Sequence, residues 1–179
     1  MKASNGRRGF ALLWPGLSLV LVVLVVGAAL LSRRVALAAP AQPIAFPHRL
    51  HANAGVPCLF CHPNAMRSPI AGLPSVQRCM GCHAYVERGN PEVKKIAQYW
   101  EEEKPIPWAR VILEPDFVYF SHQPHLSAGL NCETCHGDVA SMGTYQPVAR
   151  MDMGWCLDCH LEQPQEDAAR LTDCLTCHR

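Results

Sequence analysis

An uncharged apolar run near the N-terminus is the clearest hydrophobic pattern in this chain. Phe10–Leu31 holds 22 residues without a charged side chain, which at about 1.5 Å per residue is enough to cross a hydrocarbon core of roughly 30 Å. Basic residues flank the run on both sides, and their small excess before it favours a cytoplasmic N-terminus. We therefore expect residues 1–34 to form a cytoplasmic tip and a single transmembrane anchor.

A cleaved signal peptide is the alternative for the same residues. Ala36-Leu37-Ala38 has the small-x-small form that signal peptidase accepts. However, the apolar run exceeds the usual length of about 7–15 residues, and Arg33 and Arg34 separate it from that site. The pattern thus favours a retained anchor, and both alternatives place the remaining chain outside the cytoplasm.

A second helix is predicted in the middle of the chain. Asn90 is suited to cap it, Pro91 suits its first turn, and Pro105 prevents its continuation. Its apolar side chains recur at i, i+3, i+4 and i+7, and they are Val93, Ile96, Ala97 and Trp100. The rest of the sequence has no long periodic segment, so we expect a mainly α fold with few regular elements and many loops.

An internal repeat organises the remaining sequence. The pattern F-x-H-x-x-H of Phe46–His51 recurs 74 residues later at Phe120–His125, and two C-x-x-C-H motifs follow each copy. After a Pro/Ala-rich linker at 35–45 we expect one domain at 46–179. Its parts are two repeat modules at 46–89 and 120–162, a connector at 90–119, and a fifth motif within 163–179.

Ten cysteines form five C-x-x-C pairs, and a histidine directly follows each pair. The cysteines are Cys58, Cys61, Cys79, Cys82, Cys132, Cys135, Cys156, Cys159, Cys174 and Cys177. In such a motif both sulfurs form thioethers with haem, and the histidine binds the iron. A thiolate zinc site needs no histidine after each pair, and a thioredoxin-like motif occurs singly. The pattern predicts five covalently bound haem c groups with the proximal ligands His62, His83, His136, His160 and His178.

The other four histidines all lie in the repeated segments. They are His48, His51, His122 and His125, and the first of each pair precedes a motif cysteine by ten residues. We predict that they are distal ligands. Four haems would then be bis-histidine haems, whose iron carries electrons and has no open position for a substrate.

No histidine remains as a distal ligand for the fifth haem. A methionine thioether is a soft ligand for haem iron and raises its reduction potential. Met142 and Met153 are the alternative candidates, because both lie in the second module near motif cysteines. The position could instead be open or held by a lysine.

The chain is short for so many haems. The part after Arg34 supplies 29 residues per haem, too few for separate aliphatic cores, so we expect the haems themselves to form the core. This part carries 11 basic and 15 acidic side chains, which argues against a nucleic-acid partner.

The combination of these features resembles a known family. One N-terminal apolar helix, paired F-x-H-x-x-H segments and five C-x-x-C-H motifs are similar to the pentahaem cytochrome subunit of alternative complex III. The single modules resemble the c3/c7 class of multihaem cytochromes. Further similar segments are Gly72-Leu73-Pro74-Ser75 before Cys79, Pro115–Phe120, and Met153-Gly154-Trp155 before Cys156.

The resemblance implies an electron-transfer subunit of a quinol-oxidising complex in the respiratory chain. Such a complex lies in the bacterial inner membrane, and the haem domain of a single-pass subunit faces the periplasm. Electrons would come from polytopic quinol-binding membrane subunits through a large iron–sulfur, molybdopterin-like subunit. They would leave to a monohaem cytochrome c or a similar periplasmic acceptor. The chain itself would have no catalytic site.

Three other functions use the same motifs. The main alternative is a stand-alone, membrane-anchored multihaem quinol dehydrogenase that feeds a periplasmic reductase. A second is a soluble periplasmic shuttle released by signal cleavage. The third, a multihaem nitrite reductase, needs a C-x-x-C-K motif for its catalytic haem, and this sequence has none.

Overall fold

The computed structural model describes residues 7–36, 38–112 and 114–178. Contacts within the chain divide it into two compact units, one up to Ala38 and one from Ala39 onward. Over the described ranges the regular elements are helices and no strand occurs, which confirms the mainly α fold class. In chain order the elements are α1 (Arg7–Ala36), α2 (His48–Asn53), α3 (Cys58–Cys61), η1 (Pro63–Met66), α4 (Val76–His83), α5 (Pro91–Glu101), α6 (His122–Ser127), α7 (Cys132–His136), η2 (Val139–Ser141), α8 (Met153–Leu161), α9 (Gln165–Leu171) and α10 (Cys174–Cys177).

The first unit is the helix α1, which contains the uncharged run Phe10–Leu31. Its large apolar side chains between Leu17 and Leu31 are 51–70% exposed. None of the helices, as far as their residues are described, has both the length and the apolar character that a membrane crossing needs. A helix is thus present where one was predicted, but its role as a transmembrane anchor is not supported. Residues 1–6 of the predicted cytoplasmic tip lie outside the described ranges.

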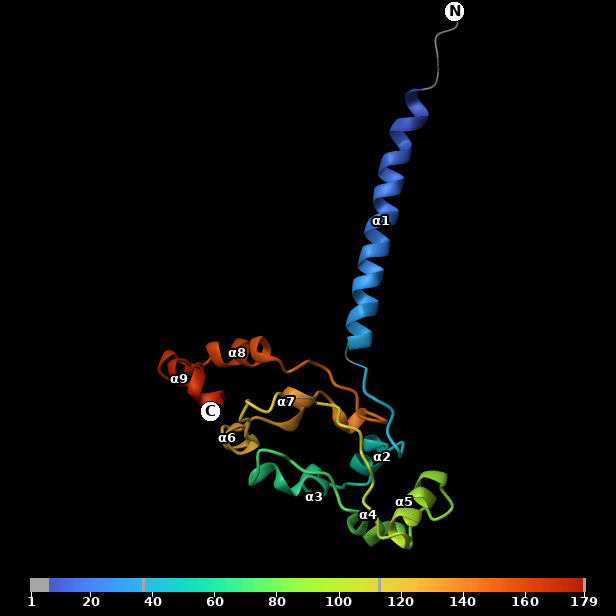
Figure 1. Ribbon diagram of the computed structural model, residues 1–179, viewed down its shortest axis with the longest axis vertical. Helices are drawn as coiled ribbons and strands as arrows, with labels where there is room; N and C mark the ends of the chain where they lie inside the picture. Colours follow the sequence, from blue (N-terminus) through green and yellow to red (C-terminus); the bar gives the residue numbers. More distant parts are fainter. Residues whose placement is uncertain (1–6, 37, 113, 179) are drawn as a thin grey trace, which may run out of the picture. The chain divides into compact units, whose positions relative to one another are not determined.

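The second unit consists of short helices joined by loops (Figure 1), and each C-x-x-C-H motif lies in or directly beside one of these helices. Ser75, Asp152 and Asp173 accept hydrogen bonds from main-chain amides at the starts of α4, α8 and α10. Such caps satisfy amide groups that have no partner within the helix. In every motif the two cysteines are three residues apart, so a single helical turn brings both sulfurs to one face.

The helix predicted after Asn90 is confirmed as α5, Pro91–Glu101. The Asn90 side chain accepts a hydrogen bond of 2.9 Å from the amide two residues further on, and the proline occupies the first helical position. Val93 and Ile96 are buried, whereas Trp100 is 46% exposed. The predicted apolar face therefore packs along its first part and reaches solvent at its end.

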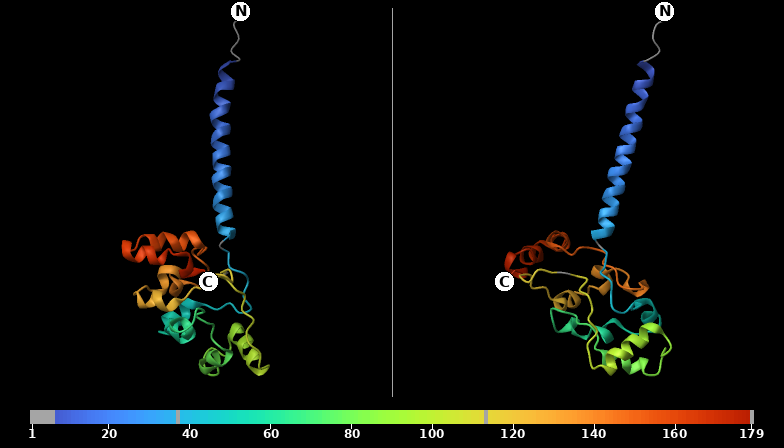
Figure 2. Two further views of the ribbon diagram at one scale, coloured as in Figure 1. Left: turned by 60° about the vertical axis from the view of Figure 1, so that its left-hand side comes forward. Right: turned by 45° about the vertical axis from the view of Figure 1, so that its right-hand side comes forward.

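α5 packs beside α4 (Figure 2), and a small apolar core lies where they meet. Ile44, Ile96 and Ile106 form its buried centre, and Cys79 and Trp108 pack against them. Few other apolar side chains are buried among the described residues. This agrees with the expectation that so short a chain builds little aliphatic core of its own.

The segment after η2 returns to the first repeat and contacts α2. The carbonyl oxygen of Met142 accepts a hydrogen bond of 2.8 Å from the Arg49 amide, and that of Gly143 accepts one of 3.1 Å from the His48 amide. We call residues 142–148 the bridging segment, because it joins the start of the first module to the second.

Gly137 fixes the other end of the bridging segment. Its backbone angles, φ 71° and ψ −173°, lie in a region that is essentially restricted to glycine. A Cβ atom at this position would lie 2.6 Å from Cγ1 of Val148. The absence of a side chain thus lets the bridging segment approach α7 directly after His136.

Candidate haem-binding sites

All nine histidines hold the Nδ1 atom of their ring against an oxygen. His136 faces the phenol oxygen of Tyr145 at 3.3 Å, and the other eight face main-chain carbonyl oxygens at 2.6–3.4 Å. The carbonyl pairs are His48 with Gly143, His51 with Pro47, His62 with Gly72, His83 with Val86, His122 with Pro69, His125 with Ser121, His160 with Leu171 and His178 with Phe117.

For the eight histidines that face a carbonyl oxygen, this arrangement leaves the other ring nitrogen available. A carbonyl oxygen can only accept, so Nδ1 carries the proton and Nε2 keeps its lone pair. Metal-binding histidines show the same arrangement, in which the second nitrogen donates to a carbonyl or a carboxylate. Burial also lowers the pKa of His48 and of His136, which favours the neutral ring that binds metals. The donor set therefore fits haem iron.

Three pairs of histidine rings have the separation that one iron between two imidazoles requires. With metal–nitrogen bonds of about 2 Å and about 1 Å from each nitrogen to its ring centre, two axial imidazoles have centroids roughly 6 Å apart. The three observed pairs are His51 with His83 at 6.1 Å, His122 with His136 at 6.4 Å, and His125 with His160 at 6.1 Å. Each pair joins one histidine of a repeated segment to one histidine of a C-x-x-C-H motif.

A fourth pair follows from the repeat. The 74-residue offset relates His48 to His122 and His62 to His136, so the counterpart of the second pair is His48 with His62. Burial lowers the pKa of His48 most, and the nearby His62 adds to that shift. The repeat and this contribution of His62 favour the same pairing in the first module.

Cysteines of different motifs also lie near one another. Burial raises the pKa of the Cys79 thiol, and the Cys61 thiol contributes to the same shift. The pKa of Cys132 is likewise raised by burial and then by the Cys58 thiol. Because such effects weaken with distance, the motif at 58–62 has a neighbouring thiol in each of the motifs at 79–83 and 132–136.

The second module continues this arrangement. Burial raises the pKa of Cys135, with a contribution from Cys159. Burial also raises the pKa of Cys156, with its largest further contribution from Cys177. The motif at 156–160 therefore has a neighbouring thiol in each of the motifs at 132–136 and 174–178.

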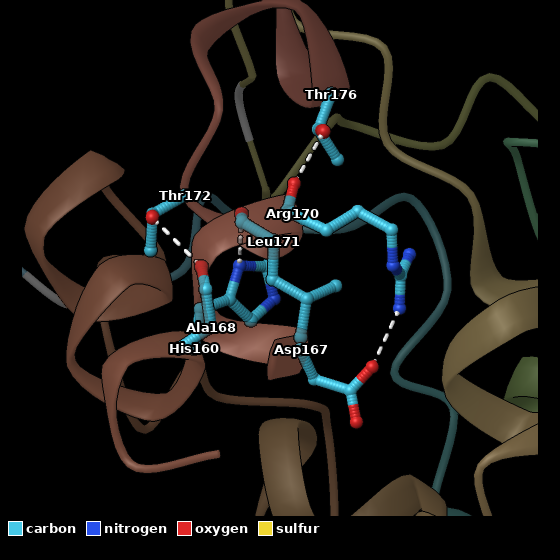
Figure 3. A network of polar contacts seen from close by, with 7 residues as sticks. All are labelled: His160, Asp167, Ala168, Arg170, Leu171, Thr172 and Thr176. Atoms are coloured by element: carbon cyan, nitrogen blue, oxygen red, sulfur yellow. Dashed lines mark hydrogen bonds and ion pairs between the residues drawn. The ribbon is translucent and has the colours of Figure 1, made fainter. Parts of the chain in front are cut away.

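The helix α9 connects the last two motifs (Figure 3). At its end the Leu171 carbonyl accepts a hydrogen bond of 3.1 Å from His160, and the Arg170 carbonyl accepts one of 2.8 Å from the Thr176 hydroxyl inside the fifth motif. The Thr172 hydroxyl donates to the Ala168 carbonyl at 2.8 Å, which holds the end of the helix. Two consecutive carbonyls thus fix the relative position of these motifs.

The fifth motif is also held by the segment that precedes the second repeat. The amide of Tyr119 donates to the Cys177 carbonyl at 2.8 Å, and the Phe117 ring lies 5.7 Å from the His178 ring. Of the two methionine candidates, Met142 is bound through its carbonyl to α2. Met153 is 63% exposed at the start of α8, the helix that carries Cys156. No ring or hydrogen-bond contact described for either methionine places it at His178.

A buried polar atom near the second motif provides a further test of the fit. Nε1 of Trp108 is buried and has no hydrogen-bond partner among the described residues. Trp108 packs on the same core as Cys79. A haem attached at Cys79 would bring propionate oxygens, which are acceptors for an indole N–H.

No pattern in the sequence indicates Tyr145 or the carbonyls that orient the histidines. Tyr145 lies in a loop without periodicity, and its partner His136 precedes it by nine residues. Backbone carbonyls are present at every position, so no residue type marks those that bind a ring. These contacts depend on the tertiary structure alone.

Comparison with known proteins agrees with this donor set. A family model for cytochrome c7 and related cytochrome c matches residues 118–179. The multihaem cytochrome c subunit of menaquinone reductase from Nitratidesulfovibrio vulgaris is 32% identical over 77% of each chain. The C-type polyhaem cytochrome OmcB from Geobacter sulfurreducens is 31% identical over 46% of this chain, but over 9% of its own length. This chain therefore belongs to the family of multihaem c-type cytochromes that includes the menaquinone reductase subunit, and it binds haem c covalently.

Proposed function

We propose that this chain relays electrons through five covalently bound haems as a subunit of a membrane-associated quinone oxidoreductase complex. The three histidine ring pairs at 6.1–6.4 Å carry the proposal. Haem supplies one-electron chemistry, and the chain supplies two imidazoles for each of these irons, which leaves no position for a substrate. The chain would thus be an electron carrier and not the catalytic subunit.

The distal ligands follow one rule in this proposal. The first histidine of each repeat serves the first motif of its module, and the second histidine serves the second motif. His48 would bind the haem of His62, and His51 that of His83. The equivalent pairs of the second module, His122 with His136 and His125 with His160, support the rule because both have the required separation.

We propose a linear electron path that follows the order of the motifs in space. The neighbouring thiols support the order 79–83, 58–62, 132–136, 156–160 and 174–178. This order differs from the sequence, because the first two motifs exchange places. The motifs at 79–83 and 174–178 are the two ends, and we propose that the redox partners bind there.

The haem of the fifth motif would have a methionine as its distal ligand. Between the two candidates we favour Met153, because its helix carries Cys156, whose thiol is a neighbour of Cys177. Met142 is held at α2 in the first module. A methionine would give this haem a higher reduction potential than its four bis-histidine neighbours.

The relatives support a quinone-reactive partner, and they are compatible with two opposite directions of electron flow. The resemblance to the subunit of alternative complex III implies quinol oxidation, with iron–sulfur and polytopic membrane subunits as donors and a monohaem cytochrome c as acceptor. The name of the menaquinone reductase subunit favours the opposite direction, from a periplasmic donor to the quinone. The exposed apolar side chains of α1, between Leu17 and Leu31, provide a surface through which membrane subunits could hold the chain on the periplasmic side.

Purification of the chain from native membranes in mild detergent tests this function. We expect it to co-purify with an iron–sulfur subunit and with polytopic membrane subunits. In the purified complex, menaquinol should reduce the haems if quinol is the donor, as read from the visible α-band. If the complex reduces menaquinone, haems that have been reduced beforehand should be reoxidised by added menaquinone. A chain that purifies alone and oxidises quinol by itself would contradict the proposal and support the stand-alone quinol dehydrogenase.

A further inference from the structure

The Tyr145 ring lies between histidines of the two modules. Its centroid is 6.4 Å from that of His48 and 6.1 Å from that of His136, and its plane is inclined by about the same angle, 65° and 66°, to the two rings. In the proposed path His48 serves the haem at 58–62 and His136 the haem at 132–136. Tyr145 thus occupies the junction at which electrons pass between the modules.

His136 is the histidine whose Nδ1 faces a side chain instead of a backbone carbonyl. If Nε2 of His136 binds iron, Nδ1 carries the proton, so the Tyr145 oxygen accepts the hydrogen bond at 3.3 Å. A tyrosine phenol has an ordinary pKa of about 10, so near neutral pH the acceptor is a neutral phenol. A neutral phenol oxygen is a weaker acceptor than an amide carbonyl, which serves the other eight histidines.

The strength of this hydrogen bond affects the iron through the ring. A strong acceptor at Nδ1 makes the imidazole more electron-rich, which stabilises ferric iron and lowers the reduction potential. A weak acceptor has the opposite effect. We propose that Tyr145 is a positioning residue that holds the haem at 132–136 at a higher potential than the other bis-histidine haems. This inference rests on the proposed haem ligation. It adds that the haem at the junction of the modules is reduced more readily than the other bis-histidine haems.

The bridging segment places Tyr145 firmly enough for this role. Two residues before it, the Gly143 carbonyl accepts hydrogen bonds from the amide of His48 at 3.1 Å and from its Nδ1 at 3.4 Å. Three residues after it, Val148 packs against Gly137, which directly follows His136. The phenol is therefore held from both modules.

The test is a redox titration of the haem-loaded chain with Tyr145 changed to Phe. This variant keeps the ring and removes the acceptor, so the ring of His136 becomes less electron-rich. We expect one of the five components to rise by up to about a tenfold change in its ferrous-to-ferric ratio, which corresponds to about 59 mV for one electron. The electron paramagnetic resonance signal of one low-spin haem should change with it. Tyr145→Gln offers a carbonyl acceptor, so it should lower the same component.

Three controls separate this inference from the haem ligation on which it rests. Tyr99→Phe removes a phenol that packs on the apolar core and should shift no component. In a chain with Cys132→Ser and Cys135→Ser, the change of Tyr145 to Phe should leave the remaining four components unchanged. The mass of each variant counts its haems, so loss of haem is recognised directly. A fully loaded Phe variant with unchanged potentials, or a Gln variant that raises the potential, would overturn the inference, whereas a wild-type chain without haem at 132–136 would overturn the proposed function.

Discussion

The imidazole rings of His125 and His160 face each other with their centroids 6.1 Å apart and their planes inclined by 23°. A hydrogen bond at Nδ1 restricts the rotation of each ring. Nδ1 of His125 donates to the Ser121 carbonyl at 2.8 Å, and Nδ1 of His160 donates to the Leu171 carbonyl at 3.1 Å. The two free nitrogens are thus presented by rings whose rotation is restricted. The separation of the two rings is the one that two axial ligands of one iron require.

Removal of His125 should affect the haem of His160 and no other. In His125→Ala we expect one haem to change from low spin to high spin, because its iron loses the sixth ligand, as measured by electron paramagnetic resonance. Gln123→Ala, an exposed position on the same helix, is the matched control and should keep all haems low-spin. The pairing is tested by adding Cys156→Ser and Cys159→Ser to His125→Ala, which should abolish the high-spin signal. If that signal persists in the combined variant, His125 serves a different haem.

The number of haems should follow the number of intact motifs. Cys174→Ser with Cys177→Ser removes both thioether positions of the fifth motif, so the mass of the mature chain should decrease by one haem. The wild-type chain should carry five haems by the same measurement. A variant that carries as many haems as the wild-type chain would show that 174–178 is not a haem site, and a wild-type chain with four haems would contradict the count of five.

The methionine ligand of the fifth haem predicts a distinct spectroscopic signal. A methionine-to-ferric-iron charge-transfer band should appear in the near-infrared magnetic circular dichroism of the oxidised chain. We expect Met153→Leu to remove this band, because leucine has a similar volume and no sulfur, and Met142→Leu to retain it. If Met142→Leu removes the band instead, the choice between the two methionines is wrong. A wild-type spectrum without the band would exclude both.

The backbone of Gly137 should be sensitive to any side chain. Gly137→Ala places a Cβ in a conformation that costs about 1–3 kcal/mol for residues other than glycine, and it also meets Val148. We expect the free energy of unfolding of the haem-loaded chain to fall by that amount in denaturant titrations followed by haem absorbance. Gly89→Ala is the control, because its Cβ would meet no atom within 4 Å and its φ is not positive. Equal stability of the two variants would contradict the predicted strain.

Several features could be predicted because their chemistry is local. The start of α5 follows from Asn90 and Pro91, whose capping and first-turn preferences act within one helical turn. The exposed Trp100 shows the limit of the same pattern: periodicity indicates which side chains share a face, but not how far a neighbouring element covers that face. Hydropathy alone likewise predicts a transmembrane role for Phe10–Leu31, and the described helices do not support it.

The sequence by itself determined where haem can be attached, because two thiols and an imidazole within five residues form a site without help from the rest of the fold. Only the tertiary structure decided how these sites are related. The proximity of the His51 and His83 rings, the proposed exchange of the first two motifs in the path and the contact of Tyr145 with His136 each join residues from different turns and loops. A histidine can bind an iron only if its ring nitrogen lies about 2 Å from that iron. Packing, and not sequence order, decides which histidine lies so close to which iron.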